Sequence, residues 1–128
     1  MNQHISKQFD NELDNIRGRV MAMGGLVEKQ LTDALKALTD SDIELGQIVI
    51  TNEPRVNSYE VSIDEECTQT LARRQPAAGD LRLITAVIKT ITDLERIGDE
   101  AKKVAQMAIY LSEKQGTKSY YVGINTMG

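Results

Sequence analysis

The feature that most constrains the fold is the spacing of apolar residues, which recur at steps of three and four over most of the chain. One stripe keeps its phase over residues 5–38, a second runs over residues 45–71, and a third runs over residues 81–111. Such spacing places apolar side chains on one side of an α-helix, where they can be buried. The sequence therefore predicts three long amphipathic helices.

Polar and helix-breaking residues separate the three stripes. Residues 39–42 carry hydroxyl and carboxylate side chains suited to capping a helix, and residues 73–80 contain a proline, a glycine and an aspartate. Short connections between long helices make neighbouring helices antiparallel. We therefore predict an all-α fold, an antiparallel three-helix bundle over residues 1–114. Residues 115–128 lack a helical period and are predicted to form an irregular tail.

Composition narrows the classes of function. The formal net charge is −4, and Lys and Arg are scattered among acids, so no basic face for a nucleic acid is expected. The first residues lack the apolar core of a signal peptide, and no apolar run reaches the length of a membrane span. The single cysteine, Cys67, is expected to be a buried, unreactive thiol. Together these features favour a cytoplasmic protein.

Small and flexible residues in the first stripe suggest details of packing. Gly24 and Gly25 interrupt the helix without changing its phase, which predicts a close helix contact or a slight bend there. Met21 and Met23 flank them and are expected to fill the core. Gly98 is expected to permit a close approach on the third helix.

Two pairs of acidic residues lie beside the apolar stripes at the same spacing. Glu60 and Asp64 are one turn apart on the second helix, and Glu95 and Asp99 are one turn apart on the third. At about 100° per residue, each pair is expected on a bundle-facing side. A carboxylate beside an apolar stripe needs a cation, a hydrogen-bond donor or a metal ion to compensate it.

The spacing alone leaves two interpretations of these carboxylates open. They are structural or solvated ion pairs, because several Lys and Arg residues share the same helices, or they converge on a hard or borderline cation. The only histidine is His4, so the Glu-x-x-His pairs of ferritin-like di-iron sites are missing and oxidase chemistry is disfavoured.

Three segments carry a resemblance to a known family. They are residues 20–28 (Val-Met-Ala-Met-Gly-Gly-Leu-Val-Glu), residues 60–67 (Glu-Val-Ser-Ile-Asp-Glu-Glu-Cys), and residues 73–99, which open with Arg-Arg-Gln-Pro-Ala-Ala-Gly-Asp and end with Asp-Leu-Glu-Arg-Ile-Gly-Asp. Together they resemble the PhoU family. The likeness covers roughly residues 4–114, which is the first of the two three-helix repeats expected of that family.

The resemblance implies a cytoplasmic regulatory adaptor that restrains phosphate-starvation signalling. Its implied partners are the phosphate transporter's ATPase subunit PstB and the sensor kinase PhoR. The family's Glu/Asp-x-x-x-Asp motifs can hold iron or zinc, and the matching positions are Glu60, Asp64, Glu95 and Asp99. A lone repeat lacks its partner repeat, so a homodimer is expected.

Three hypotheses on function follow. The first is a non-enzymatic signalling adaptor, because the sequence shows no nucleophile–base pair, Gly-rich phosphate loop or histidine cluster. The second is a carboxylate-bridged metal hydrolase or oxidase that uses the four acids as ligands. The third is a purely structural helical bundle in a larger assembly.

Overall fold

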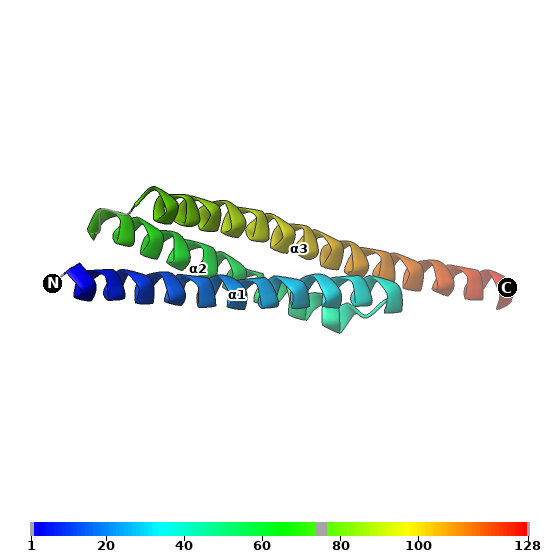
Figure 1. Ribbon diagram of the computed structural model, residues 1–128. Coiled ribbons are helices and arrows are strands. Elements are labelled where there is room, and N and C mark those ends of the chain that lie inside the picture. Colours follow the sequence, from blue (N-terminus) through cyan, green and yellow to red (C-terminus); the bar gives the residue numbers. More distant parts are fainter. Residues whose placement is uncertain (1, 74–76, 128) are drawn as a thin grey trace. The chain divides into compact units, whose positions relative to one another are not determined.

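The computed structural model describes residues 2–73 and 77–127, and it describes side chains for residues 7–73 and 77–115. The chain forms three helices, α1 (Asn2–Asp40), α2 (Ile43–Arg73) and α3 (Ala78–Met127), as Figure 1 shows. No strand occurs among these residues. The prediction of an all-α fold built from three long helices is confirmed.

The end of the chain differs from the sequence prediction. Helix α3 continues to Met127, so an irregular tail is wrong for residues 115–127. Extending a helix that already exists adds one hydrogen bond for each residue fixed, without the cost of a new nucleus. The last dozen residues also contain no proline that would stop the helix. The lack of a helical apolar period after residue 114 was therefore not enough to predict that the helix ends there.

The connection between α1 and α2 consists of Ser41 and Asp42. Ser41 has a φ of 54°, in the left-handed region, and the Asp42 N–H donates to the Ala37 carbonyl at 2.9 Å, which closes the end of α1. The Asp42 carboxylate then accepts from the Leu45 N–H at 3.0 Å and caps α2. The predicted short, capped turn is confirmed.

The second predicted turn falls partly on residues 74–76, which lie outside the described residues. Helix α3 begins at Ala78, so Asp80 lies in its first turn rather than before it. A negative charge there interacts favourably with the helix dipole.

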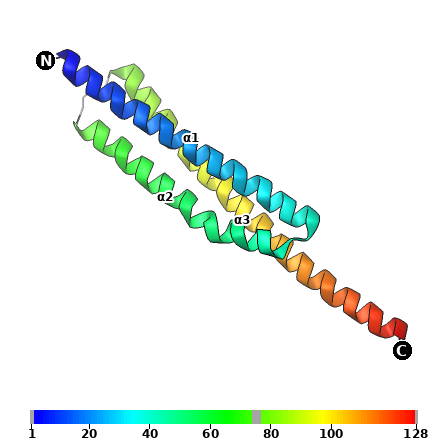
Figure 2. The same cartoon turned by 90° about the horizontal axis from the view of Figure 1, so that it is seen from below.

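The chain divides into two compact units, and every helix contributes to both. The first unit comprises Met1–Val27 and Pro54–Ile97, and the second comprises Glu28–Glu53 and Gly98–Gly128. The division does not fall at residue 114, where the sequence analysis placed the start of a tail. In each unit, segments of all three helices pack together, and they can be followed by colour in Figures 1 and 2.

The core of the first unit consists of residues that the stripes predicted, with the addition of Val87. The buried members are Phe9, Leu13, Ile16, Met23, Val27, Val56, Ile63, Cys67, Ile84, Val87 and Ile91. Met21 is 76% exposed, so its expected core role is wrong. Residues two apart point about 200° apart around a helix, and Met23 already faces the core. Leu81, at the start of the third stripe, is also exposed.

The core of the second unit is built from smaller side chains. Ala34, Val49, Ala101 and Ala105 are fully buried. A Cβ at Gly46 would lie 3.1 Å from Cγ1 of Ile109, which is tight for a carbon–carbon contact. Small residues thus let α2 and α3 approach closely in this unit.

The expected close contact at Gly24 and Gly25 is wrong. A Cβ at either position would meet nothing within 4 Å. A close approach occurs instead at Gly46, which the sequence analysis did not single out. Gly98 is buried, as a close approach would require.

Cys67 is fully buried in the first unit, as predicted. Burial, followed by the negative charges of Asp64 and Glu66, raises the pKa of its thiol from 9.0 to about 11. The thiol therefore stays protonated in the folded chain at neutral pH. Because only the unfolded chain ionises between pH 9 and about 11, this group makes folding less favourable as the pH rises through that interval.

A buried polar contact joins α1 to α2 in the second unit. The side chain of Gln30 is 2% exposed, and its Nε2 donates to the Val49 carbonyl at 2.7 Å. A buried amide without a partner would be costly, so this bond fixes which residues of the two helices face each other. Helix α2 continues beyond Val49 and through Pro54, although proline has no backbone N–H to donate.

Replacing Gln30 by methionine should lower the free energy of unfolding by about 1 kcal/mol, because a buried hydrogen bond is lost while the side-chain length is kept. Urea denaturation measures the change. The matched control is Gln47→Met, an exposed glutamine in the same unit, which should have little effect. Equal losses in both variants would show that the Gln30 bond contributes nothing specific.

Candidate functional site

The four predicted metal ligands differ in their exposure. Glu60 and Glu95 are half-buried, and one carboxylate oxygen of Glu95 is buried. Asp64 and Asp99 are exposed. Asp99 lies 3.7 Å from Nζ of Lys103, so a lysine already compensates its charge.

The exposure of the two aspartates follows from helix geometry. Each step of four residues turns about 40° further around the helix axis, so the second acid of each pair lies nearer to solvent than the first. The expectation that Asp64 and Asp99 face the bundle is therefore wrong.

The described side chains alone do not supply a complete set of metal ligands. Among them, no three His, Cys, Asp or Glu groups are arranged to hold an ion. The described side chains thus do not by themselves make a complete iron or zinc site, because such sites normally use four or more ligands. Metal binding by Glu60, Asp64, Glu95 or Asp99 stays a prediction.

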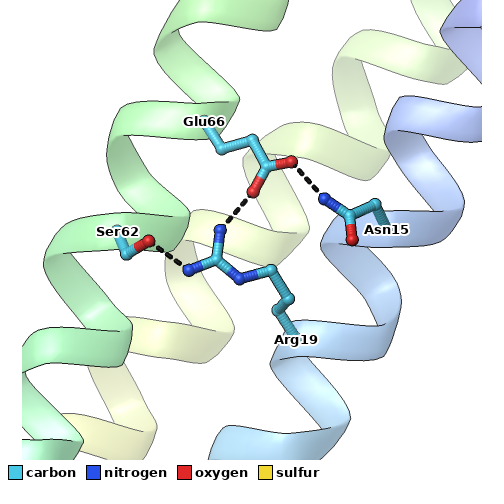
Figure 3. A network of polar contacts seen from close by, with 4 residues as sticks. All are labelled: Asn15, Arg19, Ser62 and Glu66. Atoms are coloured by element: carbon cyan, nitrogen blue, oxygen red, sulfur yellow. Dashed lines mark hydrogen bonds and ion pairs between the residues drawn. The ribbon is translucent and has the colours of Figure 1, made fainter.

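The first unit contains a polar network between α1 and α2 (Figure 3). Arg19 donates from Nη1 to the Glu66 carboxylate and from Nη2 to the Ser62 hydroxyl. The other carboxylate oxygen of Glu66 accepts from Nδ2 of Asn15 at 2.6 Å. Residues 15 and 19 are one turn apart on α1, and residues 62 and 66 are one turn apart on α2. The higher-numbered residue of one helix faces the lower-numbered residue of the other, so the two segments run antiparallel.

Partial burial gives this network more weight than a surface ion pair. The side chains of Arg19 and Glu66 are 32% and 19% exposed. For comparison, the pair Arg17–Asp14 on α1 joins side chains that are 57% and 72% exposed, at 3.3 Å. Exposed pairs of that kind contribute little because water and salt screen them. The Arg19–Glu66 pair also crosses between helices, so it constrains their register.

A surface cavity of about 350 Å³ opens beside this network. It is lined by Arg19 of α1 and by Arg55, Ser58, Tyr59 and Ser62 of α2. The four α2 residues follow steps of three and four, which places them on one helix face. Two guanidinium groups and three hydroxyl-bearing side chains therefore surround one space.

Sequence reasoning missed these residues for a physical reason. The partners are more than 40 residues apart, so their pairing depends on the register between two helices, which periodicity does not give. The available signal was polar residues at steps of three and four on both helices, next to the apolar stripes.

Exposed apolar side chains gather on one face of α3 in the second unit. Met107, Tyr110 and Leu111 are 56%, 60% and 45% exposed, and they lie three and four residues apart. Nζ of Lys114 lies 5.7 Å from the centre of the Tyr110 ring, within the range of a cation–π contact. The buried position predicted for Leu111 is therefore wrong. A face of this kind is suited to contact with another protein surface.

None of the helices, as far as the described residues go, has an apolar stretch long enough to cross a bilayer.

Comparison with known protein families gives one match, to the PhoU domain, over residues 20–108. Among relatives, the phosphate-specific transport system accessory protein PhoU homolog of Pseudomonas aeruginosa is 52% identical over 128 residues, which is the whole of this chain and 53% of that protein. The PhoU accessory protein of Escherichia coli K12 is 50% identical over 109 residues, or 85% of this chain and 45% of that protein. The chain thus spans about half the length of these relatives.

Solved structures give the same result. The crystal structure of PhoU from Pseudomonas aeruginosa superposes with a TM-score of 0.82 at 56% identity, over 83% of this chain and 51% of that one. PhoU from Streptococcus pneumoniae, described as a phosphate transport system regulatory protein, superposes with a TM-score of 0.75 at 30% identity, over 79% and 48% of the two chains.

Replacing Arg19 by methionine should lower the free energy of unfolding by about 1–2 kcal/mol, since Glu66 then loses its charge partner in a half-buried position while the aliphatic stem is kept. Chemical denaturation tests this. Arg17→Met, which breaks only the exposed pair with Asp14, should cost no more than about 0.5 kcal/mol. If the two variants have the same free energy of unfolding, the network does not stabilise the packing of α1 against α2.

Proposed function

Because the chain belongs to the PhoU family, we propose that it acts as a non-catalytic regulatory adaptor of phosphate transport. In this proposal it works in the cytoplasm as a negative regulator of phosphate-starvation signalling. Its proposed partners are the transporter's ATPase subunit PstB and the sensor kinase PhoR.

The observation that carries the proposal is the extent of the family match. The domain model covers residues from all three helices, and two relatives named as accessory proteins of phosphate transport are 50–52% identical to this chain. Identity of this order over all or most of a chain favours a shared binding role. Because the chain spans about half of each relative, its activity and partners are proposed from those relatives rather than observed.

The described features suit an adaptor better than the metal enzyme considered from the sequence. The network of Arg19, Ser62 and Glu66 joins one helix to another, and the four acids do not form a metal centre among the described side chains. A purely structural bundle remains the competing hypothesis. Binding to phosphate-transport partners separates the two.

The proposal also includes pairing of two chains through the face formed by Met107, Tyr110 and Leu111. A second copy of the chain would place the same apolar face opposite this one, as a two-fold contact requires. Exposed apolar side chains at steps of three and four supply the contact that such pairing needs.

The adaptor proposal predicts that the immobilised chain retains PstB or the cytoplasmic part of PhoR. A two-repeat homologue run in parallel is the positive control. One repeat should bind more weakly than two linked repeats, because linked sites raise the effective concentration. If the homologue retains its partners and this chain retains neither, the adaptor proposal fails and the structural bundle is favoured.

The same preparation reports on pairing. Sedimentation at micromolar concentration should show a dimer, and Leu111→Glu should shift it to monomer because the change places a charge in an apolar contact. Met21→Glu, on an exposed methionine of the first unit, is the matched control and should leave the dimer intact. A wild-type chain that sediments only as a monomer contradicts pairing.

Metal binding by the four acids is a separate part of the proposal, since the described side chains alone do not form a complete site. Any bound iron or zinc should contact Glu60, Asp64, Glu95 or Asp99. Elemental analysis of the purified protein should therefore show less metal after a Glu95→Ala, Asp99→Ala double substitution. Unchanged metal content in the double variant would exclude these two residues as ligands.

A further inference from the structure

We infer that the cavity lined by Arg19, Arg55, Ser58, Tyr59 and Ser62 binds the phosphoryl group of a small molecule. The assignment goes beyond the adaptor role and does not depend on it, since it rests on side chains of the first unit alone. Two guanidinium groups with neighbouring hydroxyls are the donors that proteins use to hold tetrahedral oxyanions.

The two arginines of the cavity differ in their contacts and in their exposure. Arg19 is held in place by Glu66 and Ser62, and a guanidinium group has more N–H donors than these two bonds use. Arg55 is exposed and has no ion-pair partner among the described residues. The charge of Arg19 is largely balanced by Glu66, so Arg55 supplies the uncompensated positive charge of the cavity.

The hydroxyl groups complete the set of donors. Ser62 accepts from Arg19, which leaves its own proton available to an oxyanion. Tyr59 is half-buried against the apolar core and also lines the cavity. The Ser58 hydroxyl donates to the Pro54 carbonyl at 3.1 Å. Ser58 therefore helps to shape the cavity wall, and its hydroxyl can donate to a ligand only if that hydrogen bond breaks.

The size of the cavity points to more than a bare oxyanion. At about 350 Å³ it lies within the range of small-molecule sites, and the aromatic ring of Tyr59 offers an apolar surface beside the charged groups. Inorganic phosphate and a nucleoside monophosphate share the phosphoryl chemistry and differ in whether that extra space is used.

Calorimetric titration of the full chain with inorganic phosphate and with adenosine monophosphate, at constant ionic strength, tests the assignment. We expect saturable binding of at least one of the two, with the nucleotide tighter if the ring surface is used. Arg55→Gln should weaken binding about tenfold, because a charge-assisted hydrogen bond is lost. Arg82→Gln makes the same charge change on an exposed arginine of the same unit outside the cavity, and it should leave the affinity unchanged.

Glu66→Gln separates binding from stability. It removes the carboxylate that competes with the ligand for Arg19, so it should tighten binding while lowering the stability of the fold. A merely structural role for the network would not tighten binding. No saturable binding of either ligand, equal weakening in Arg55→Gln and Arg82→Gln, or no gain in Glu66→Gln would each overturn the assignment.

Discussion

All packing in this chain depends on one constraint, which is that long helices bury apolar side chains repeating every three or four residues. Single aliphatic residues such as Ile16, Ile63 and Ile91 meet in the first unit, and alanines replace them in the second. The two units therefore both bury an apolar core between three helices, but with side chains of different volume. Larger side chains hold helices apart and leave room for polar groups at the margin, and small ones allow the close approach seen at Gly46.

Polar groups then select one arrangement among those that apolar burial would allow. Apolar contact is non-directional, so helices could slide along each other at modest cost. Gln30 bound to the Val49 carbonyl and Arg19 bound to Glu66 each work at one relative position of α1 and α2 only. One contact lies in each unit, so each unit carries its own means of setting register.

Most of the fold could be predicted from the sequence, because burial of Leu13, Ile63 and Ile84 follows from spacing within one helix. Pairings between helices could not, and the Arg19 network is the clearest case. Errors arose where a residue lies at the edge of a stripe: Asp64, Asp99 and Leu111 each lie within three residues of a buried residue and are themselves exposed. The resemblance to the PhoU family identified the family correctly, whereas the candidate cavity came only from the three-dimensional arrangement.

The fully buried position of Cys67 gives the chain an internal reporter of its own motion. It is the single sulfhydryl group in the sequence, and its raised pKa suppresses the thiolate that alkylating reagents attack. Modification therefore requires the first unit to open transiently, and its rate at fixed pH counts those openings. Local fluctuations of one unit can thus be followed in the native chain without introducing a label elsewhere.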